Sequence, residues 1–239
     1  MTEPLLSISH VRAGYGASAV LYDASIDVLP GEMVGLVGHN GAGKTTLLRA
    51  AMGFVRAWEG EVRVKGVSVL GEPPHQRVVR GVGYVPDGRQ IFANLTVAQN
   101  LALARALSHR ATAGKKFDAQ TTDNVRSLFP ILAEREKQHA GLLSGGEQQM
   151  LSIAMALISQ PELVILDEPT IGLSPKVADE VLRVVAMLGE RLGAGVLIVE
   201  QNVRRLLDFA DRVEVMKLGR TIGPVSSNQV TDEELWSLF

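Results

Sequence analysis

The sequence predicts a layered α/β fold, and two patterns along the chain indicate it. Short apolar runs at 33–37, 163–166 and 196–199 are typical of strands that are buried on both faces of a parallel sheet. Helical patterns alternate with these runs, and this alternation implies right-handed βαβ crossovers. With 239 residues, of which 46% are hydrophobic and 21% charged, the chain can bury a core of this kind.

Further strands are indicated by period-two alternation of apolar and polar residues. Residues 5–13 and 25–29 alternate enough to predict two strands. Residues 61–70 predict either one strand or a hairpin whose turn lies at Lys65 and Gly66. These segments add strands beside the three buried runs.

Five helices are predicted from a period of 3.6 residues. They span 44–52, 97–107, 123–132, 147–158 and 176–192. Because 96–160 carries helices without intervening strands, we interpret it as an all-helical subdomain inserted into a core formed by 1–95 and 161–239. Within it, 108–122 is rich in Ala, Thr, Gly and Lys and is predicted to be a loop. The chain is then a single domain that carries one insertion.

An eight-residue motif lies between the first buried run and the first helix. It matches the phosphate-binding loop, or P-loop, G-x-x-x-x-G-K-[ST]. Its residues, with the helical residue that follows, are Gly38, His39, Asn40, Gly41, Ala42, Gly43, Lys44, Thr45 and Thr46. Glycines let backbone N–H groups surround a polyphosphate, Lys44 brings positive charge to it, and the Thr45 hydroxyl can ligate Mg²⁺. The motif therefore predicts a nucleoside triphosphate site.

Two adjacent carboxylates, Asp167 and Glu168, follow the apolar run at 163–166. A P-loop enzyme needs an acid at the end of a neighbouring strand to hold Mg²⁺. Because side chains alternate in direction along a strand, we expect different roles for the two acids. Asp167 would hold the metal and Glu168 would polarise the attacking water as general base. The alternative is a strand that ends in two solvated acids.

A glycine pair opens the helix predicted at 147–158, in the segment Ser144, Gly145, Gly146 and Glu147. Ser144 and Glu147 fit the capping box S-x-x-E. A cap alone does not require two glycines, each of which costs up to about 1 kcal/mol inside a helix. Bare N–H groups at a helix N-terminus bind anions, so the segment predicts a second phosphate-binding element as well as a cap.

In this order, the P-loop, the L-S-G-G-E-Q-Q segment and the strand ending in Asp-Glu-Pro resemble the ATP-binding cassette (ABC) ATPases. The resemblance covers essentially the whole chain. It implies a P-loop NTPase core with a mixed sheet, an antiparallel β subdomain and an inserted α-helical subdomain. It also implies ATP and Mg²⁺ as ligands. In that family two cassettes pack head to tail, so each chain holds two half-sites and needs a partner cassette.

The resemblance also assigns residues around the nucleotide. Tyr15 falls where the family places an aromatic residue against adenine, although an aromatic residue on a surface strand is the alternative. Val20 falls where an aliphatic residue flanks the adenine or the ribose. Asp87 stands where the family has a glutamine that contacts Mg²⁺, and its carboxylate can still bind the metal.

Two further positions depart from the family pattern. Ser174 stands where an aspartate is usual, and with Pro175 it also forms a good start for the next helix. Gln201 stands where a histidine contacts the γ-phosphate and orients the catalytic water. An amide cannot carry a proton charge, so with Glu168 and Lys44 in place we expect slower or differently regulated hydrolysis rather than none.

The departures themselves resemble one subfamily, the LivF-type ATPases of branched-chain amino-acid importers. The shared features are an acid after Val-Pro, the Gly-Leu-Ser-Pro segment and Val-Glu-Gln-Asn. The implied partners are a LivG-type ATPase or a second copy of this chain, transmembrane permease subunits and, indirectly, an extracytoplasmic solute-binding protein. Importers of urea and short-chain amides use similar ATPases, so the substrate stays open.

Composition bears on the remaining function classes. The formal net charge of −2 argues against a nucleic-acid partner. The sequence has no cysteine, no apolar run of about 18 residues and no signal-peptide pattern at its start. We therefore expect a cytoplasmic chain that reaches the cytoplasmic face of the cell membrane through its permease. DNA-maintenance and translation-factor cassettes are disfavoured without a coiled coil or a second cassette, whereas a non-hydrolysing regulatory cassette remains an alternative.

Overall fold

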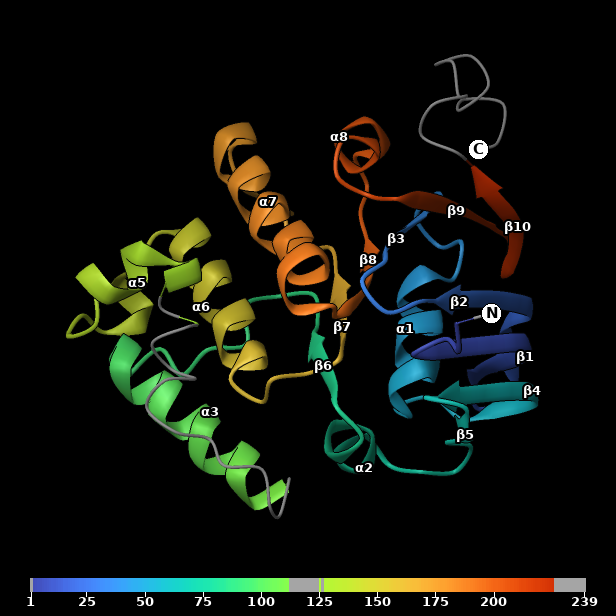
Figure 1. The fold of residues 1–239 in the computed structure, drawn as a ribbon. Helices are drawn as coiled ribbons and strands as arrows, with labels where there is room; N and C mark the ends of the chain where they lie inside the picture. Colours follow the sequence, from blue (N-terminus) through green and yellow to red (C-terminus); the bar gives the residue numbers. More distant parts are fainter. Residues whose placement is uncertain (1, 112–124, 126, 226–239) are drawn as a thin grey trace.

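A computed structural model describes residues 2–111, 125 and 127–225, and these residues form one sheet of ten strands (Figure 1). The strands are β1 Leu6–Tyr15, β2 Ser18–Val28, β3 Met33–Val37, β4 Ala57–Val64, β5 Val67–Ser68, β6 Val82–Val85, β7 Leu163–Asp167, β8 Gly195–Val199, β9 Arg212–Lys217 and β10 Arg220–Val225. Their spatial order is β5-β4-β1-β2-β10-β9-β3-β8-β7-β6. The predicted α/β class and mixed sheet are confirmed.

The sheet has a parallel part and an antiparallel part. Strands β6, β7, β8, β3 and β9 pair in parallel, as the apolar runs predict. Strands β1, β2, β4 and β5 pair antiparallel, and β4 and β5 form the hairpin that turns at Lys65 and Gly66. The two parts meet where β10 pairs with β2 at the single position Arg220 and Asp23.

The helices lie on both sides of the parallel strands (Figure 1). They are α1 Lys44–Met52, α2 Pro74–Val79, α3 Val97–Ala111, α5 Pro130–Glu134, α6 Gly145–Leu157, α7 Pro175–Leu192 and α8 Val203–Leu207, with a 3₁₀ turn η1 at Ala140–Leu142. Among the described residues, no helix combines the length and the apolarity needed to cross a membrane.

Alternating side chains on the parallel strands build two separate cores. Val34 and Leu36 of β3 pack with α1 and with the antiparallel strands. Met33 and Val37 of the same strand pack on the other face, with residues of α3, α6 and α7. Helix α1 is therefore enclosed between the two parts of the sheet, whereas the helices of 96–160 and α7 share one core on the far side.

Two predicted elements of the 96–160 segment differ from the structure. The loop predicted at 108–122 begins too early, because α3 continues to Ala111, and the rest of it lies outside the described residues. The single helix predicted at 123–132 is wrong in its last part: Phe129 is not helical and Pro130 starts α5. Proline lacks the N–H that a helix interior needs, so it begins a new helix there.

A buried arginine, which no sequence pattern indicated, closes the end of α1. Arg77 of α2 is only 3% exposed and donates hydrogen bonds to the carbonyl oxygens of Ala50 (2.7 Å), Ala51 and Val69 (2.9 Å). Burial lowers the pKa of Arg77 to about 10, which still leaves it charged at neutral pH. The last carbonyls of a helix lack intrahelical partners, and a cation there also suits the helix dipole.

Replacing Arg77 with methionine is therefore expected to lower the free energy of unfolding by about 3 kcal/mol or more, because buried carbonyls lose their donors. Urea unfolding at pH 7 measures the loss. The matched control is Arg80→Met, which removes a partly exposed arginine paired with Glu72 and should leave the urea midpoint close to that of the wild type. Equal losses in the two variants would contradict the role assigned to Arg77.

Candidate nucleotide site

The P-loop connects the end of β3 to the start of α1. Two glycines shape it: Gly43 precedes α1 with φ 113°, and a Cβ atom at Gly38 would lie 2.2 Å from the Met216 carbonyl oxygen. A side chain at either position would therefore be strained or would clash. The loop directs the N-terminal N–H groups of α1 outward, which is the geometry that binds phosphate.

Lys44, the first residue of α1, is 6% exposed. Its Nζ donates to the carbonyl oxygens of Gly38 (2.7 Å) and His39 (3.2 Å). Burial lowers the pKa of Lys44, while the charges of Glu168 and Asp167 act in the opposite direction. The ammonium group is thus held over the loop, where it can exchange a carbonyl partner for a phosphate oxygen.

A cavity of about 240 Å³ lies over this loop. It is lined by Val20, Asn40, Gly41, Gly43, Lys44, Thr45, Thr46 and Glu168. The structure therefore brings together predicted residues from β2, the P-loop, α1 and the end of β7. An open cavity with one cation, backbone N–H groups and a carboxylate suits a polyphosphate and its reacting end.

Asp167 and Thr45 form the candidate metal site. Asp167 ends β7, is 1% exposed, and its Oδ1 accepts a hydrogen bond of 3.2 Å from the Thr45 hydroxyl. Its buried Oδ2 has no partner among the described residues. Burial raises the pKa of Asp167 to about 6; the Thr45 hydrogen bond opposes this shift, and the charges of Glu168 and Asp87 add to it. An orphaned carboxylate oxygen beside a hydroxyl is a donor set that fits Mg²⁺.

Glu168 takes a backbone conformation that is unusual for a residue with a side chain, with φ 48°. Such conformations cost about 1–3 kcal/mol and tend to lie at functional sites. The Glu168 N–H donates to the Val199 carbonyl oxygen (3.0 Å), and Gln201 Nε2 donates to Glu168 Oε2 (2.7 Å). The two residues predicted to handle the attacking water are therefore in direct contact.

The Ser144–Glu147 segment forms the predicted capping box: Ser144 N–H donates to Glu147 Oε2 (2.7 Å), and Glu147 N–H donates to Ser144 Oγ (3.3 Å). None of these four residues lines the P-loop cavity. A packing reason for the second glycine emerges as well, because a Cβ at Gly146 would lie 2.4 Å from Val177 Cγ1 of α7. Phosphate binding at this segment stays a prediction.

Three other predicted residues do not line the cavity. Tyr15 ends β1, is 47% exposed, and its hydroxyl accepts a hydrogen bond of 3.3 Å from Arg49. Asp87 is exposed, and its charge reaches Asp167. Ser174 occupies the N-cap position of α7 and Pro175 the first turn, as predicted, but the Ser174 side chain makes no capping hydrogen bond.

Sequence reasoning missed four residues at this site. Arg49 of α1 lies between Tyr15 and Tyr84, and its electrostatic neighbours include Asp167. Burial raises the pKa of Tyr84 to about 12, and the charge of Asp167 adds to the rise. Glu200 and Thr170 form a buried pair behind Glu168. The detectable signal was Glu200, a charged residue placed directly after an apolar strand.

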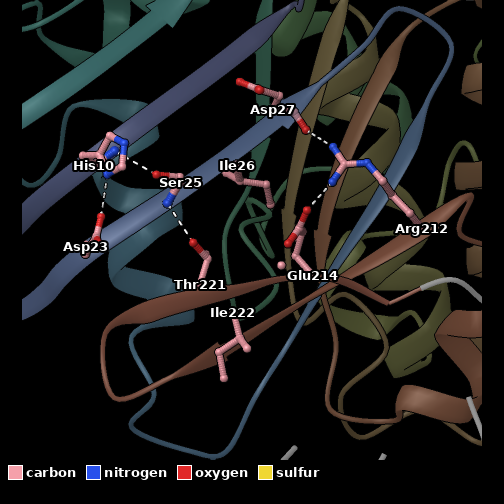
Figure 2. A pocket seen from close by; sticks show the side chains of 10 residues that line it. His10, Asp23, Ser25, Ile26, Asp27, Arg212, Glu214, Thr221 and Ile222 are labelled. Carbon is pink, nitrogen blue, oxygen red and sulfur yellow. Dashed lines mark hydrogen bonds and ion pairs between the residues drawn. The ribbon is translucent and has the colours of Figure 1, made fainter.

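A larger cavity of about 520 Å³ opens between β2 and the β9–β10 hairpin (Figure 2). Several of its charged side chains form ion pairs: His10 Nδ1 lies 2.9 Å from Asp23 Oδ1, and Arg212 pairs with Glu214 and with Glu32 (2.6 Å), which lies outside the lining. None of the predicted site residues lines it. Its size therefore does not make it the nucleotide site.

Comparison with known proteins agrees with the motifs. The sequence profile described as ABC transporter matches residues 21–171. BraG of Pseudomonas aeruginosa, a high-affinity branched-chain amino acid transport ATP-binding protein, is 41% identical over 91% of each chain. LivF of Archaeoglobus fulgidus, a probable branched-chain amino acid transport ATP-binding protein, is 35% identical over 96% of this chain and 95% of its own. LptB of Haemophilus influenzae, a lipopolysaccharide export system ATP-binding protein, is 34% identical over 96% and 94%.

The fold is also that of known cassettes. A crystallised ATP-binding cassette of an ABC transporter superposes with a TM-score of 0.85 over 99% of each chain, at 24% identity. A nucleotide-free cassette superposes with a TM-score of 0.81, at 23% identity. These similarities establish the fold, and the profile match and the relatives above 30% identity establish the family. The chain belongs to the ABC transporter family, as one of its ATP-binding cassette proteins.

Proposed function

We propose that this chain is the ATP-hydrolysing motor subunit of an importer for branched-chain amino acids. The observation that carries hydrolysis is the contact between Gln201 and Glu168 at the edge of the P-loop cavity. The support for the substrate is the 41% identity to BraG, together with the LivF-like residues Asp87, Ser174 and Gln201. The 34% identity to LptB favours lipopolysaccharide export as the second candidate.

The site divides the work of hydrolysis among its residues. Lys44 and the P-loop N–H groups bind the β- and γ-phosphates, and Tyr15 offers a face for the adenine. Thr45 and Asp167, with Asp87 nearby, would hold Mg²⁺, which neutralises charge on the phosphates when it is bound. Glu168 accepts a proton from the attacking water, and Gln201 keeps the Glu168 carboxylate in place through a charge-assisted hydrogen bond.

The second half of each site would come from a partner cassette. The Ser144–Glu147 segment does not line the cavity of its own chain, which is consistent with a role against the nucleotide of another cassette. That cassette is a LivG-type ATPase or a second copy of this chain. Binding of ATP would close the pair and hydrolysis would reopen it, and permease subunits at the cytoplasmic face of the membrane would convert this cycle into transport.

The substrate can be identified from the ligand whose binding protein stimulates ATP hydrolysis by the assembled transporter. The full chain is co-purified with its permease subunits and reconstituted in proteoliposomes, and the ATPase rate is measured with a solute-binding protein loaded with leucine, isoleucine or valine. We expect stimulation by the loaded protein, and none in Lys44→Ala, whose phosphate binding is lost. Stimulation of the ATPase rate by urea or short-chain amides would instead assign one of these compounds as the substrate. Stimulation by lipopolysaccharide alone would select export.

A further inference from the structure

Glu200 is a buried carboxylate that the proposed mechanism does not use. It follows β8 directly and is 4% exposed. No ion pair joins it to a lysine or an arginine within the described ranges of the chain. Burial raises the pKa of Glu200, and the hydrogen bonds from Thr170 and from the Gln201 backbone act against that rise. Burying a carboxylate without a cation is costly, so its neighbours should explain its presence.

Both oxygens of Glu200 bind one residue. Thr170 N–H donates to Oε1 (3.1 Å) and the Thr170 hydroxyl donates to Oε2 (2.8 Å). Thr170 is itself buried, and it lies two positions after Glu168. A two-point bond fixes the rotation of a segment as well as its position. The carboxylate therefore ties the chain after β7 to the chain after β8.

The same two segments carry the residues that handle the attacking water. Glu168 needs external support for its left-handed backbone conformation, and its N–H bonds to Val199, the residue before Glu200. Gln201, the residue after Glu200, bonds to the Glu168 carboxylate. The Thr170–Glu200 pair thus lies directly behind the Glu168–Gln201 pair, and each pair joins the same two strand ends.

We propose that Glu200 is a positioning residue for ATP hydrolysis: its carboxylate holds Thr170 and thereby aligns the general base Glu168 with Gln201. This inference rests on the proposed function, in which Glu168 is the base. An error of about 1 Å in the placement of a reacting group can cost 10²-fold in rate. The pair therefore contributes to the turnover rate without touching the nucleotide.

Three substitutions separate positioning from structural support. Glu200→Leu keeps a similar volume but has no polar atom in its side chain, so both Thr170 bonds are lost. Thr170→Val removes the hydroxyl with little change in volume, and Thr170→Ser restores it. In the full chain with Mg²⁺ and ATP, we expect kcat to fall about 10- to 100-fold in Glu200→Leu and Thr170→Val. KM and the calorimetric affinity for ATP should change less than about twofold, and Thr170→Ser should retain most of kcat.

A double-mutant cycle with Glu168→Gln supplies the decisive readout. If Glu200 acts through Glu168, adding Glu200→Leu to Glu168→Gln causes little further loss of kcat. A full further loss, a wild-type kcat in both Glu200→Leu and Thr170→Val, or equal losses in Thr170→Val and Thr170→Ser would each overturn the positioning role. A wild-type rate in Glu168→Gln itself is a different result, because it would overturn the proposed base and the positioning role together.

Discussion

Glu168→Gln is expected to lower the rate of ATP hydrolysis by about 10²- to 10⁴-fold, the usual contribution of a general base. Glutamine has nearly the same shape and can still accept the hydrogen bond from Gln201, but it cannot accept a proton from the attacking water. The nucleotide should still bind, because Lys44 and the P-loop are unchanged. Phosphate release under saturating ATP measures the rate, and calorimetry measures the binding.

The matched control is Glu162→Gln, the same change on the residue that precedes β7 at its other end. Glu162 is exposed and pairs with Lys65 (2.5 Å), so its loss should leave the rate within about twofold of wild type. The assignment of Glu168 fails if its variant hydrolyses ATP at the rate of the Glu162 variant. If Glu168→Gln no longer binds ATP, Glu168 contributes to binding of the nucleotide rather than to the chemical step.

Asp167→Asn is expected to abolish hydrolysis and, without nucleotide, to make the protein more stable. The pKa of Asp167 is about 6 in the folded chain and about 3.8 in the absence of its environment, so ionisation destabilises the folded state. Two pKa units correspond to about 3 kcal/mol, which sets an upper bound on the gain. Thermal unfolding at pH 7 should show a rise of a few degrees for a chain of this size.

The pH dependence of this gain has a defined sign. The folded chain binds the Asp167 proton more tightly than the unfolded chain, so the destabilisation is complete above about pH 6 and shrinks as the pH falls toward 4. The stability difference between Asp167→Asn and wild type should therefore be largest at pH 7 and smaller at pH 5. Asp87→Asn, which removes an exposed acid nearby, should change stability by about 0.5 kcal/mol or less. A less stable Asp167→Asn at pH 7 would contradict the expected gain.

Local patterns predicted most of the fold and most of the residues around the cavity. The buried runs became parallel strands because a strand with helices on both faces has no polar face. The P-loop, the capping box and the Asp-Glu pair were found because each depends on residues a few positions apart. Lys44, Thr45, Asp167 and Glu168 then met in space because the carboxyl ends of β3 and β7 lie at the same edge of the sheet.

The missed features depend on partners far apart in the sequence. The β9–β10 hairpin joins β2 of the antiparallel part through one ladder pair, Arg220 and Asp23, and through neighbouring hydrogen bonds from Tyr22 and Ser25, and no local pattern encodes these contacts. Arg77 was not singled out by any pattern, because its partners Ala50 and Ala51 lie 27 and 26 positions earlier in the chain. Thr170 and Glu200 are 30 positions apart, so their bond could not be predicted from either segment alone.

The enclosed position of α1 has a consequence for how the protein unfolds locally. Only one ladder pair joins β10 to β2, so backbone pairing between strands couples the opening of the two parts of the sheet weakly. The side chains of α1 fill the core between them, so α1 makes them one cooperative unit. The phosphate-binding loop sits at the start of that helix. A bound nucleotide would therefore slow amide hydrogen exchange in strands on both sides of α1, including strands that never approach the phosphates.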